Sequence, residues 1–201
     1  YKLNPTAFEK EIAHTKKRLL TDLDEFIISE KPSEAFIHIA LANINYNYYS
    51  RKELYLSSKK RANNNNKIKY PENFFTYRDS LDLNDNTLKN YYTYHQFINR
   101  YLDNLAYQGH IKKEPTFNKI SYWHQTQKLR LIDSLITNKQ LHDNLLHNTV
   151  KRYLVHADDS QKEHDLVALF KNLDHNEAHQ KDVERYAYNT SKINAGELIP
   201  N

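Results

Sequence analysis

The stretch from Thr87 to Leu105 most constrains the fold, because its apolar side chains recur at alternating steps of three and four residues. This spacing places one continuous stripe along an amphipathic α-helix. The stripe consists of Leu88, Tyr91, His95, Ile98, Leu102 and Leu105. Tyr94, Phe97 and Tyr101 widen it into a face that is too broad for a single neighbour. Several other helices must cover such a face, so the sequence predicts a helical scaffold.

The composition favours the same class of fold. The 201 residues suffice for one large or two small domains, and 39% of them are apolar. Sixteen Tyr and eight Phe supply much of the apolar area, whereas the two Gly are too few for a sheet with many tight turns. We therefore predict an all-α domain over residues 1–192, an irregular array of about seven to eight antiparallel helices without a substantial sheet.

Capping residues divide the chain into these helices. Asn4-Pro5 is typical of a helix start, and Pro32 ends that helix near Glu30, after which Ser33 can cap the second. Further starts are predicted at Pro71, at Pro115-Thr116, and after Asn138, Asp158 or Asp159, and Asn176. Short connections between such helices favour antiparallel neighbours. Residues 61–70 contain four consecutive Asn and are predicted to form an internal loop.

Several kinds of chemistry are excluded or disfavoured by the residues present. Without Cys, the chain has no disulfide, thiolate zinc site or thiol nucleophile. The two isolated Gly form no phosphate-binding loop, and no Ser has a nucleophile-elbow context. No run of eighteen apolar residues predicts a membrane span. We predict no catalytic residues and no cofactor.

The best-placed metal candidates among the eleven His are His175 and His179, four residues apart on one helix face. The sequence HNEAH lacks the glutamate that follows the first His in zinc proteases, and no third ligand is fixed by spacing. We therefore predict exposed His at a helix end and no metal site. His95 lies on the apolar stripe and is predicted to be a hydrogen-bonded core His.

Aromatic side chains give the candidate interaction surface. The segment YNYYSRK, residues 46–52, carries three Tyr in four positions, which cover more than one side of a helix. The segment either packs between two neighbours or presents Tyr46 and Tyr49 to a ligand beside Arg51. Trp123, the single Trp, is interpreted in the same two ways, as packing or as a ligand anchor.

Four segments together resemble a known family. They are YNYYSRK at 46–52, YPENFFTYRDSLDLND at 70–85, YYTYHQFINRYLDN at 91–104 and YAYNTSKINAGELIPN at 186–201. Their pattern is similar to the helical domain that precedes the thioredoxin-like domain in bacterial envelope thiol–disulfide reductases of the TlpA/ResA type, especially Bacteroidetes forms.

The resemblance implies a non-catalytic accessory or interaction domain. Residues 193–201 would then lead toward a downstream thioredoxin-like domain that carries the Cys-x-x-Cys pair. The implied partners are that domain and a further protein, the implied location is the periplasm or cell envelope, and any membrane tether would lie outside this chain. No catalytic residue carries over, because the chain lacks Cys.

Three alternatives remain. The chain could be a free-standing helical module that binds peptide or glycan in a Tyr-lined groove. It could bind RNA through the basic cluster from Lys59 to Lys69, although the net charge of +4 is interspersed and the cluster is typical of a solvated loop. The favoured hypothesis includes no nucleic acid. The last alternative is an enzyme built around a buried His95.

Overall fold

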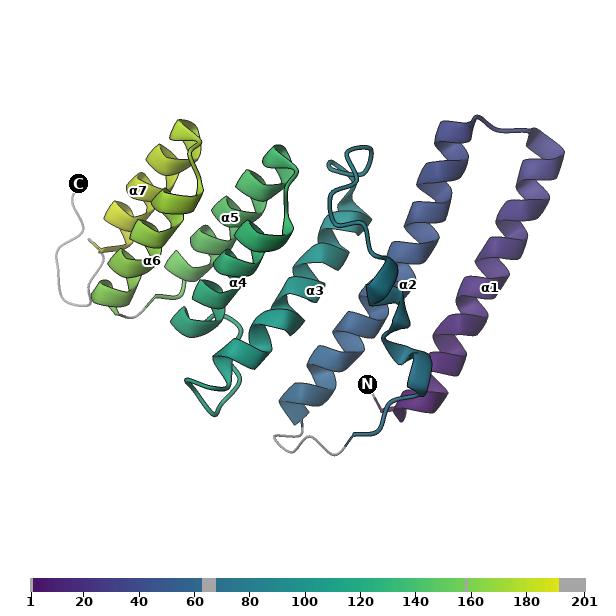
Figure 1. Ribbon diagram of the computed structural model, residues 1–201, viewed down its shortest axis with the longest axis horizontal. Helices are drawn as coiled ribbons and strands as arrows, with labels where there is room; N and C mark the ends of the chain where they lie inside the picture. Colours follow the sequence, from purple (N-terminus) through teal and green to yellow (C-terminus); the bar gives the residue numbers. More distant parts are fainter. Residues whose placement is uncertain (1, 63–67, 158, 192–201) are drawn as a thin grey trace. The chain divides into compact units, whose positions relative to one another are not determined.

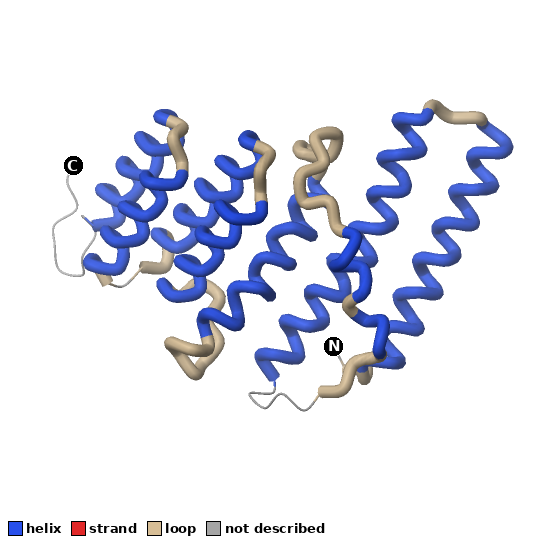
Figure 2. The backbone as a smooth tube through the Cα atoms, in the orientation of Figure 1, coloured by secondary structure: helices blue, strands red, loops and turns tan. Residues whose placement is uncertain are grey.

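The protein is all-α. The computed structural model describes residues 2–62, 68–157 and 159–191, and these segments contain seven α-helices, two short 3₁₀-helices and no strand (Figures 1 and 2). This confirms the predicted class and number of helices. The helices gather in two compact units, Tyr1–Asn104 (unit 1) and Leu105–Asn201 (unit 2). The predicted linker at 193–201 lies outside the described residues, as do residues 63–67 of the predicted loop at 61–70, whereas residues 61–62 end α2.

Unit 1 begins with two long helices, α1 (Pro5–Glu30) and α2 (Glu34–Ala62), which run antiparallel side by side (Figure 1). Asn4 caps α1 as predicted, since its side-chain oxygen accepts a backbone N–H of the first turn at 2.9 Å. Lys31 ends the helix in the left-handed region, with φ of 49°. The Ser33 hydroxyl accepts a backbone N–H of α2 at 3.3 Å.

The short helix predicted to start at Pro71 forms as two 3₁₀-helices, η1 (Glu72–Phe74) and η2 (Thr76–Ser80). Phe74 is buried in a core cluster with Phe8, Ile12 and Tyr55. These partners belong to α1 and α2, which form a helical hairpin. The short segment therefore packs against this hairpin through its Phe74 side chain.

The helix predicted from Thr87 begins later, as α3 (Tyr92–His110). Residues 86–90 form turns because the Asp85 carboxylate accepts the backbone N–H and the hydroxyl of Thr87, at 2.8 and 2.6 Å. The predicted stripe is nevertheless largely internal. Its fully buried members are Leu88, Tyr94, Phe97, Ile98 and Leu102. The boundary between the two units falls within α3, after Asn104.

Unit 2 contains four further helices, α4 (Tyr122–Leu135), α5 (Lys139–Leu154), α6 (Ser160–Leu173) and α7 (Glu177–Ser191). Helix α5 packs against α4, α6 and α7 (Figure 1). The predicted caps Asn138, Asp159 and Asn176 all accept backbone N–H groups at the starts of their helices. No helix within the described segments is long and apolar enough to cross a membrane.

The start of α4 differs from the prediction, which placed it at Pro115-Thr116. Ser121 is the cap, and the preceding turns are held by the buried ring of His110. His110 Nε2 lies 2.9 Å from the carbonyl of Thr116, and Nδ1 lies 3.0 Å from the Ser121 hydroxyl. These contacts stabilise a loop where spacing alone predicted a helical turn.

The cap of α6 allows a direct test of these local rules. Asp159 accepts the N–H groups of Gln161 and Lys162, both at 3.0 Å. We expect Asp159→Ala to lower the free energy of unfolding of unit 2 by about 1 kcal/mol. Urea unfolding followed by the fluorescence of Trp123, the only Trp and a residue of unit 2, measures this. The neighbouring Ser160→Ala is the control, and equal effects of the two changes would contradict the capping role.

Candidate functional site: a cleft around α2

The predicted aromatic segment of α2 packs on both sides. The Tyr46 ring lies 4.9 Å from that of Tyr94, and its hydroxyl donates to the carbonyl of Asp82 at 3.2 Å. The Tyr49 ring stacks on Tyr77 at 4.6 Å with an interplanar angle of 10°. Both rings are only half-buried. They therefore pack in unit 1 and still reach its surface.

A cleft of about 420 Å³ opens in unit 1 among α1, α2 and the two 3₁₀-helices. Part of its wall is aromatic, formed by Tyr48, Tyr49 and Tyr77. Its polar lining comprises Glu9, Lys16, Lys52, Asn73, Thr76 and Ser80. The cleft thus combines ring faces with ammonium, carboxylate, amide and hydroxyl groups.

Two smaller hollows adjoin this cleft and share its walls. One, of about 240 Å³, shares Lys16 and Tyr48 and adds Arg51. The other, of about 230 Å³, shares Tyr49 and Ser80. Tyr46 belongs to this second hollow. We call the three hollows together the α2 cleft. Three of the four predicted surface residues, Tyr46, Tyr49 and Arg51, line it.

Lys52 is the buried cation of the α2 cleft, with 2% of its side chain exposed. Its ammonium donates to Glu9 Oε1 at 3.1 Å and to the Tyr48 hydroxyl at 3.4 Å. The same Glu9 oxygen accepts the Tyr48 hydroxyl. Burial lowers the pKa of Lys52, although Glu9 opposes this shift. Residue spacing does not predict this pairing, because Glu9 and Lys52 belong to different helices.

Lys16 supplies a second cation on the opposite helix of the hairpin. Its ammonium lies 4.8 Å from the centroid of the Tyr48 ring and 5.4 Å from that of Tyr49. Within the segments that the structure describes, it forms no hydrogen bond or ion pair. Burial lowers its pKa, while Glu9 acts in the opposite direction. Glu9 Oε2 is likewise buried and accepts no hydrogen bond from the described residues.

A polar network beneath the cleft holds its walls. Glu53 is fully buried, and its carboxylate accepts from Arg78 Nη2 at 2.7 and 2.8 Å and from Asn104 Nδ2 at 2.6 Å. The Tyr77 hydroxyl donates to the same carboxylate. Burial lowers the pKa of Arg78, but Glu53 and Tyr77 together outweigh this effect and raise it. This network fixes Tyr77, and with it the ring on which Tyr49 stacks.

Trp123, the fourth predicted surface residue, belongs to unit 2 and is not part of the α2 cleft. Its half-buried ring meets that of Tyr122 edge-on at 4.9 Å, and the Lys113 ammonium lies 5.4 Å from its centroid. Its contacts are those of a packing residue.

The basic cluster is only partly described. The Lys59 ammonium lies 5.2 Å from the Tyr55 ring, and Lys60 donates to the carbonyl of Asn104 at 3.2 Å. Both side chains thus contact the protein, whereas residues 63–67 of the cluster lie outside the described part. His95, the alternative catalytic centre, contacts the carbonyl of Lys89 through Nε2, as a hydrogen-bonded core His does.

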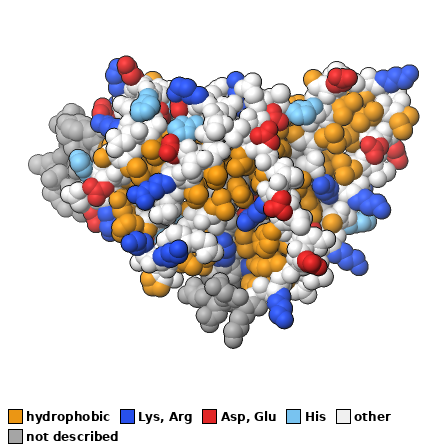
Figure 3. Space-filling view, viewed as in Figure 1, with side chains coloured by type: hydrophobic (Ala, Val, Ile, Leu, Met, Phe, Trp, Pro, Cys, Tyr) orange, Lys and Arg blue, Asp and Glu red, His pale blue; other side chains and the backbone are white. Residues whose placement is uncertain are grey.

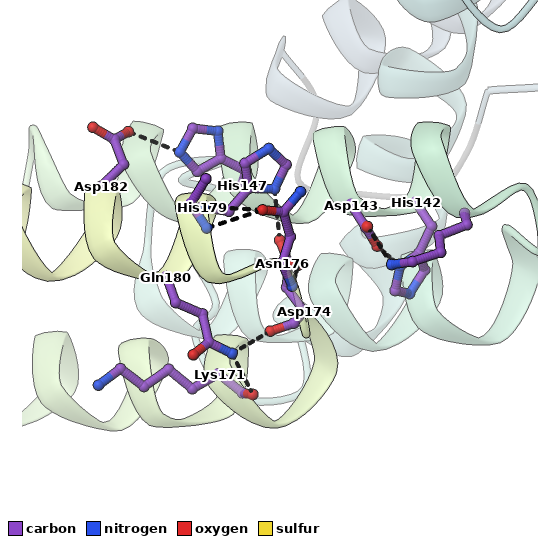
Figure 4. A network of polar contacts seen from close by, with 11 residues as sticks. His142, Asp143, His147, Lys171, Asp174, Asn176, His179, Gln180 and Asp182 are labelled. Carbon is purple, nitrogen blue, oxygen red and sulfur yellow. Dashed lines mark hydrogen bonds and ion pairs between the residues drawn. The ribbon is translucent and has the colours of Figure 1, made fainter.

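The two metal candidates, His175 and His179, have different surroundings. His175 is exposed, whereas His179 Nδ1 lies 2.9 Å from the fully buried carboxylate of Asp174 (Figure 4). The His179 ring stacks on His147 of α5 at 4.4 Å, and His147 Nε2 contacts Asp182 at 2.8 Å. Burial lowers the pKa of His147. Across the described segments, no three His, Cys, Asp or Glu are placed to hold a metal ion.

Apolar side chains are also exposed along the α1–α2 hairpin. They are Leu19, Phe26, Ile28, Phe36 and Leu41. Figure 3 shows hydrophobic side chains gathered over this hairpin on the face in view. The ring centroids of Phe26 and Phe36 lie 5.5 Å apart. This apolar face adjoins the α2 cleft, because Leu19 lines the hollow of about 240 Å³ and Leu41 lines the hollow of about 230 Å³.

Comparison of the chain with protein-family models, with curated proteins and with solved structures gives no match. The function must therefore be argued from the geometry. One exclusion is firm: a chain without cysteine cannot itself perform thiol–disulfide exchange.

Proposed function

We propose that this chain is a non-catalytic helical binding domain that holds its ligand in the α2 cleft of unit 1. The observation that carries the proposal is that three neighbouring hollows share the lining residues Lys16, Tyr48, Tyr49 and Ser80. Ligand sites are concave, of about 300–1,000 Å³, and combine aromatic walls with a few placed polar groups. The central hollow, at about 420 Å³, has this size and lining.

The walls of the cleft come from regular elements that are tied together. Glu9 of α1 contacts Lys52 and Tyr48 of α2, and Glu53 of α2 contacts Arg78 of η2. A ligand therefore meets groups that are already positioned, which lowers the entropic cost of binding. A binding role uses these groups as they are arranged, with Glu9, Lys52 and Tyr48 held by one another in the wall.

A bulky side chain at Ser80 tests this proposal, because Ser80 is exposed on the rim shared by two of the hollows. We expect Ser80→Trp to abolish ligand-induced thermal shifts measured with a panel of peptides and oligosaccharides. The matched control is Ser134→Trp in unit 2. Both hydroxyls are exposed and donate to the carbonyl three residues earlier, at 3.3 and 3.2 Å.

Two outcomes would contradict the proposal. One is a panel in which no ligand shifts the unfolding of the unmodified chain. The other is a ligand whose effect survives Ser80→Trp but is lost in Ser134→Trp, which would place the site in unit 2.

The family resemblance also leads to a proposal about the larger protein that contains this domain. Because of the four segments quoted above, we propose that the domain accompanies a thioredoxin-like domain of an envelope thiol–disulfide reductase. It would position that domain or its protein partner. A helical, cysteine-free domain is compatible with this role. Reading the gene beyond the codon for Asn201 tests it. A strand–helix pattern with Cys-x-x-Cys is expected, and a reading frame that ends there would remove the proposed parentage.

A further inference from the structure

We propose that the α2 cleft recognises an acidic saccharide, whose carboxylate binds the ammonium group of Lys16. This inference rests on the proposed binding function and names the class of ligand. It follows from the charges in the central hollow and from the groups around its rim.

One cation of the hollow forms no hydrogen bond or ion pair within the described segments. Both ammonium groups lie near one ring, at 4.8 Å (Lys16) and 4.9 Å (Lys52) from the centroid of Tyr48. Glu9 is the only carboxylate lining this hollow among the described residues, and it is already bound to Lys52. The Lys16 ammonium contacts the rings of Tyr48 and Tyr49, and no described residue accepts a hydrogen bond from it. An anion placed there would gain a charge-assisted contact without displacing an existing ion pair.

The effect of burial supports an anion at this position. Loss of solvent lowers the pKa of both lysines, and the Lys16 charge contributes to the lowered pKa of Lys52. Lys16 is therefore a cation that has lost part of its hydration. A carboxylate bound to it would offset this loss, because an opposite charge stabilises the charged form of a lysine.

The rim favours a saccharide over a peptide. Asn73, Thr76 and Ser80 are exposed there. The Asn73 amide can donate to and accept from sugar hydroxyls, and the Thr76 and Ser80 hydroxyls, which already donate to backbone carbonyls, can accept from them. Peptides are commonly bound by a sheet edge or an apolar groove. The described residues contain no strand, and the central hollow has a mainly polar lining.

The test uses the full chain and isothermal titration calorimetry with trimers of galacturonic, glucuronic and mannuronic acid. A neutral galactose trimer and triglutamate are the comparison ligands. We expect at least one uronate trimer to bind and the neutral trimer to bind at least tenfold more weakly. Lys16→Ala should weaken uronate binding about tenfold, as expected for one charge-assisted hydrogen bond, and Lys16→Arg should retain most of the affinity.

Lys17→Ala is the matched control, since Lys17 is the next residue of α1 and its side chain is exposed. It should leave binding unchanged. Circular dichroism of each variant verifies that the fold is intact.

The outcomes separate this inference from the proposed function. If the neutral trimer binds as well as the uronates and Lys16→Ala has no effect, the acidic ligand is wrong while the binding function stands. If triglutamate binds most tightly, the proposed class of ligand, a saccharide, is wrong. If none of the uronate trimers binds, the inference falls, and the panel with Ser80→Trp then decides whether the cleft binds another class of ligand.

Discussion

Glu53→Ala should lower the free energy of unfolding of unit 1 by about 3–5 kcal/mol, the cost of breaking a buried ion pair from one side. The change leaves the guanidinium of Arg78, the hydroxyl of Tyr77 and the amide of Asn104 without the carboxylate that they share. Such a loss is a large part of the stability of a small domain. Hydrogen exchange of α2 peptides during urea unfolding measures unit 1 separately from unit 2.

Two further variants identify the cause of this loss. Glu25→Ala removes an exposed carboxylate of α1 and should change the stability by less than about 0.5 kcal/mol. The double change Glu53→Ala with Arg78→Ala should cost clearly less than the sum of the single changes, because each removes the same contact. Additive effects would show that the Glu53–Arg78 pair does not hold unit 1 together.

Unit 1 should lose stability steeply above pH 10. Burial raises the pKa of Tyr46 and Tyr70 to about 12, and it also raises those of Tyr77 and Tyr94. A tyrosine in the unfolded chain ionises near pH 10. Groups with a raised folded pKa contribute their full stability below the unfolded pKa and lose it as pH rises through the folded pKa. Each pKa unit corresponds to at most about 1.4 kcal/mol, before screening by solvent reduces it.

At lower pH, the buried Lys60 makes the stability of unit 1 depend on pH in the opposite direction. Burial lowers the pKa of Lys60 to about 8, with the Arg78 charge adding to the shift. Between pH 8 and the ordinary value of 10.5, the unfolded state binds more protons than the folded state, so stability rises with pH. Unit 1 is therefore expected to be most stable near pH 9–10 and to unfold cooperatively above that range.

Tyrosine absorbance at 295 nm measures this transition directly. The folded chain should release part of its tyrosine protons only as unit 1 unfolds, in a steep step above pH 10. Tyr94→Phe is the informative variant, because its hydroxyl donates to the carbonyl of Asp82 at 2.9 Å and its pKa is raised. The step should become less steep in this variant. Gradual titration of all tyrosines near pH 10, with α2 still protected from exchange, would contradict the buried aromatic core.

Local rules predicted the fold well wherever one residue decided the outcome. The caps Asn4, Asn138 and Asp159 each act on a backbone N–H two or three residues away, and spacing alone reveals them. The predicted starts of α3 and α4 were wrong. At both positions, side-chain contacts stabilise turns in place of the helix that the spacing of apolar residues indicated. At α4 the competing group is the buried ring of His110, whose partners Thr116 and Ser121 cannot be identified from periodicity.

Three residues of the candidate site, Tyr46, Tyr49 and Arg51, were predicted from the sequence. The segment that contains them has more Tyr than one helix face requires. No role was predicted for Lys52, and its burial depends on Glu9, which belongs to another helix. No role was predicted for Lys16 either. Pairings between distant residues decide which charges are buried, and a single sequence does not specify them.

The most direct test of the account is hydrogen–deuterium exchange of the full chain, with and without the ligand that gives the largest thermal shift in the panel. The account predicts added protection at the walls of the α2 cleft, in peptides covering residues 9–16, 46–52 and 71–80. Peptides of 122–154 and 160–187 should show no change. Protection confined to unit 2, or no protection at the cleft despite binding, would contradict the assignment of the binding site to unit 1.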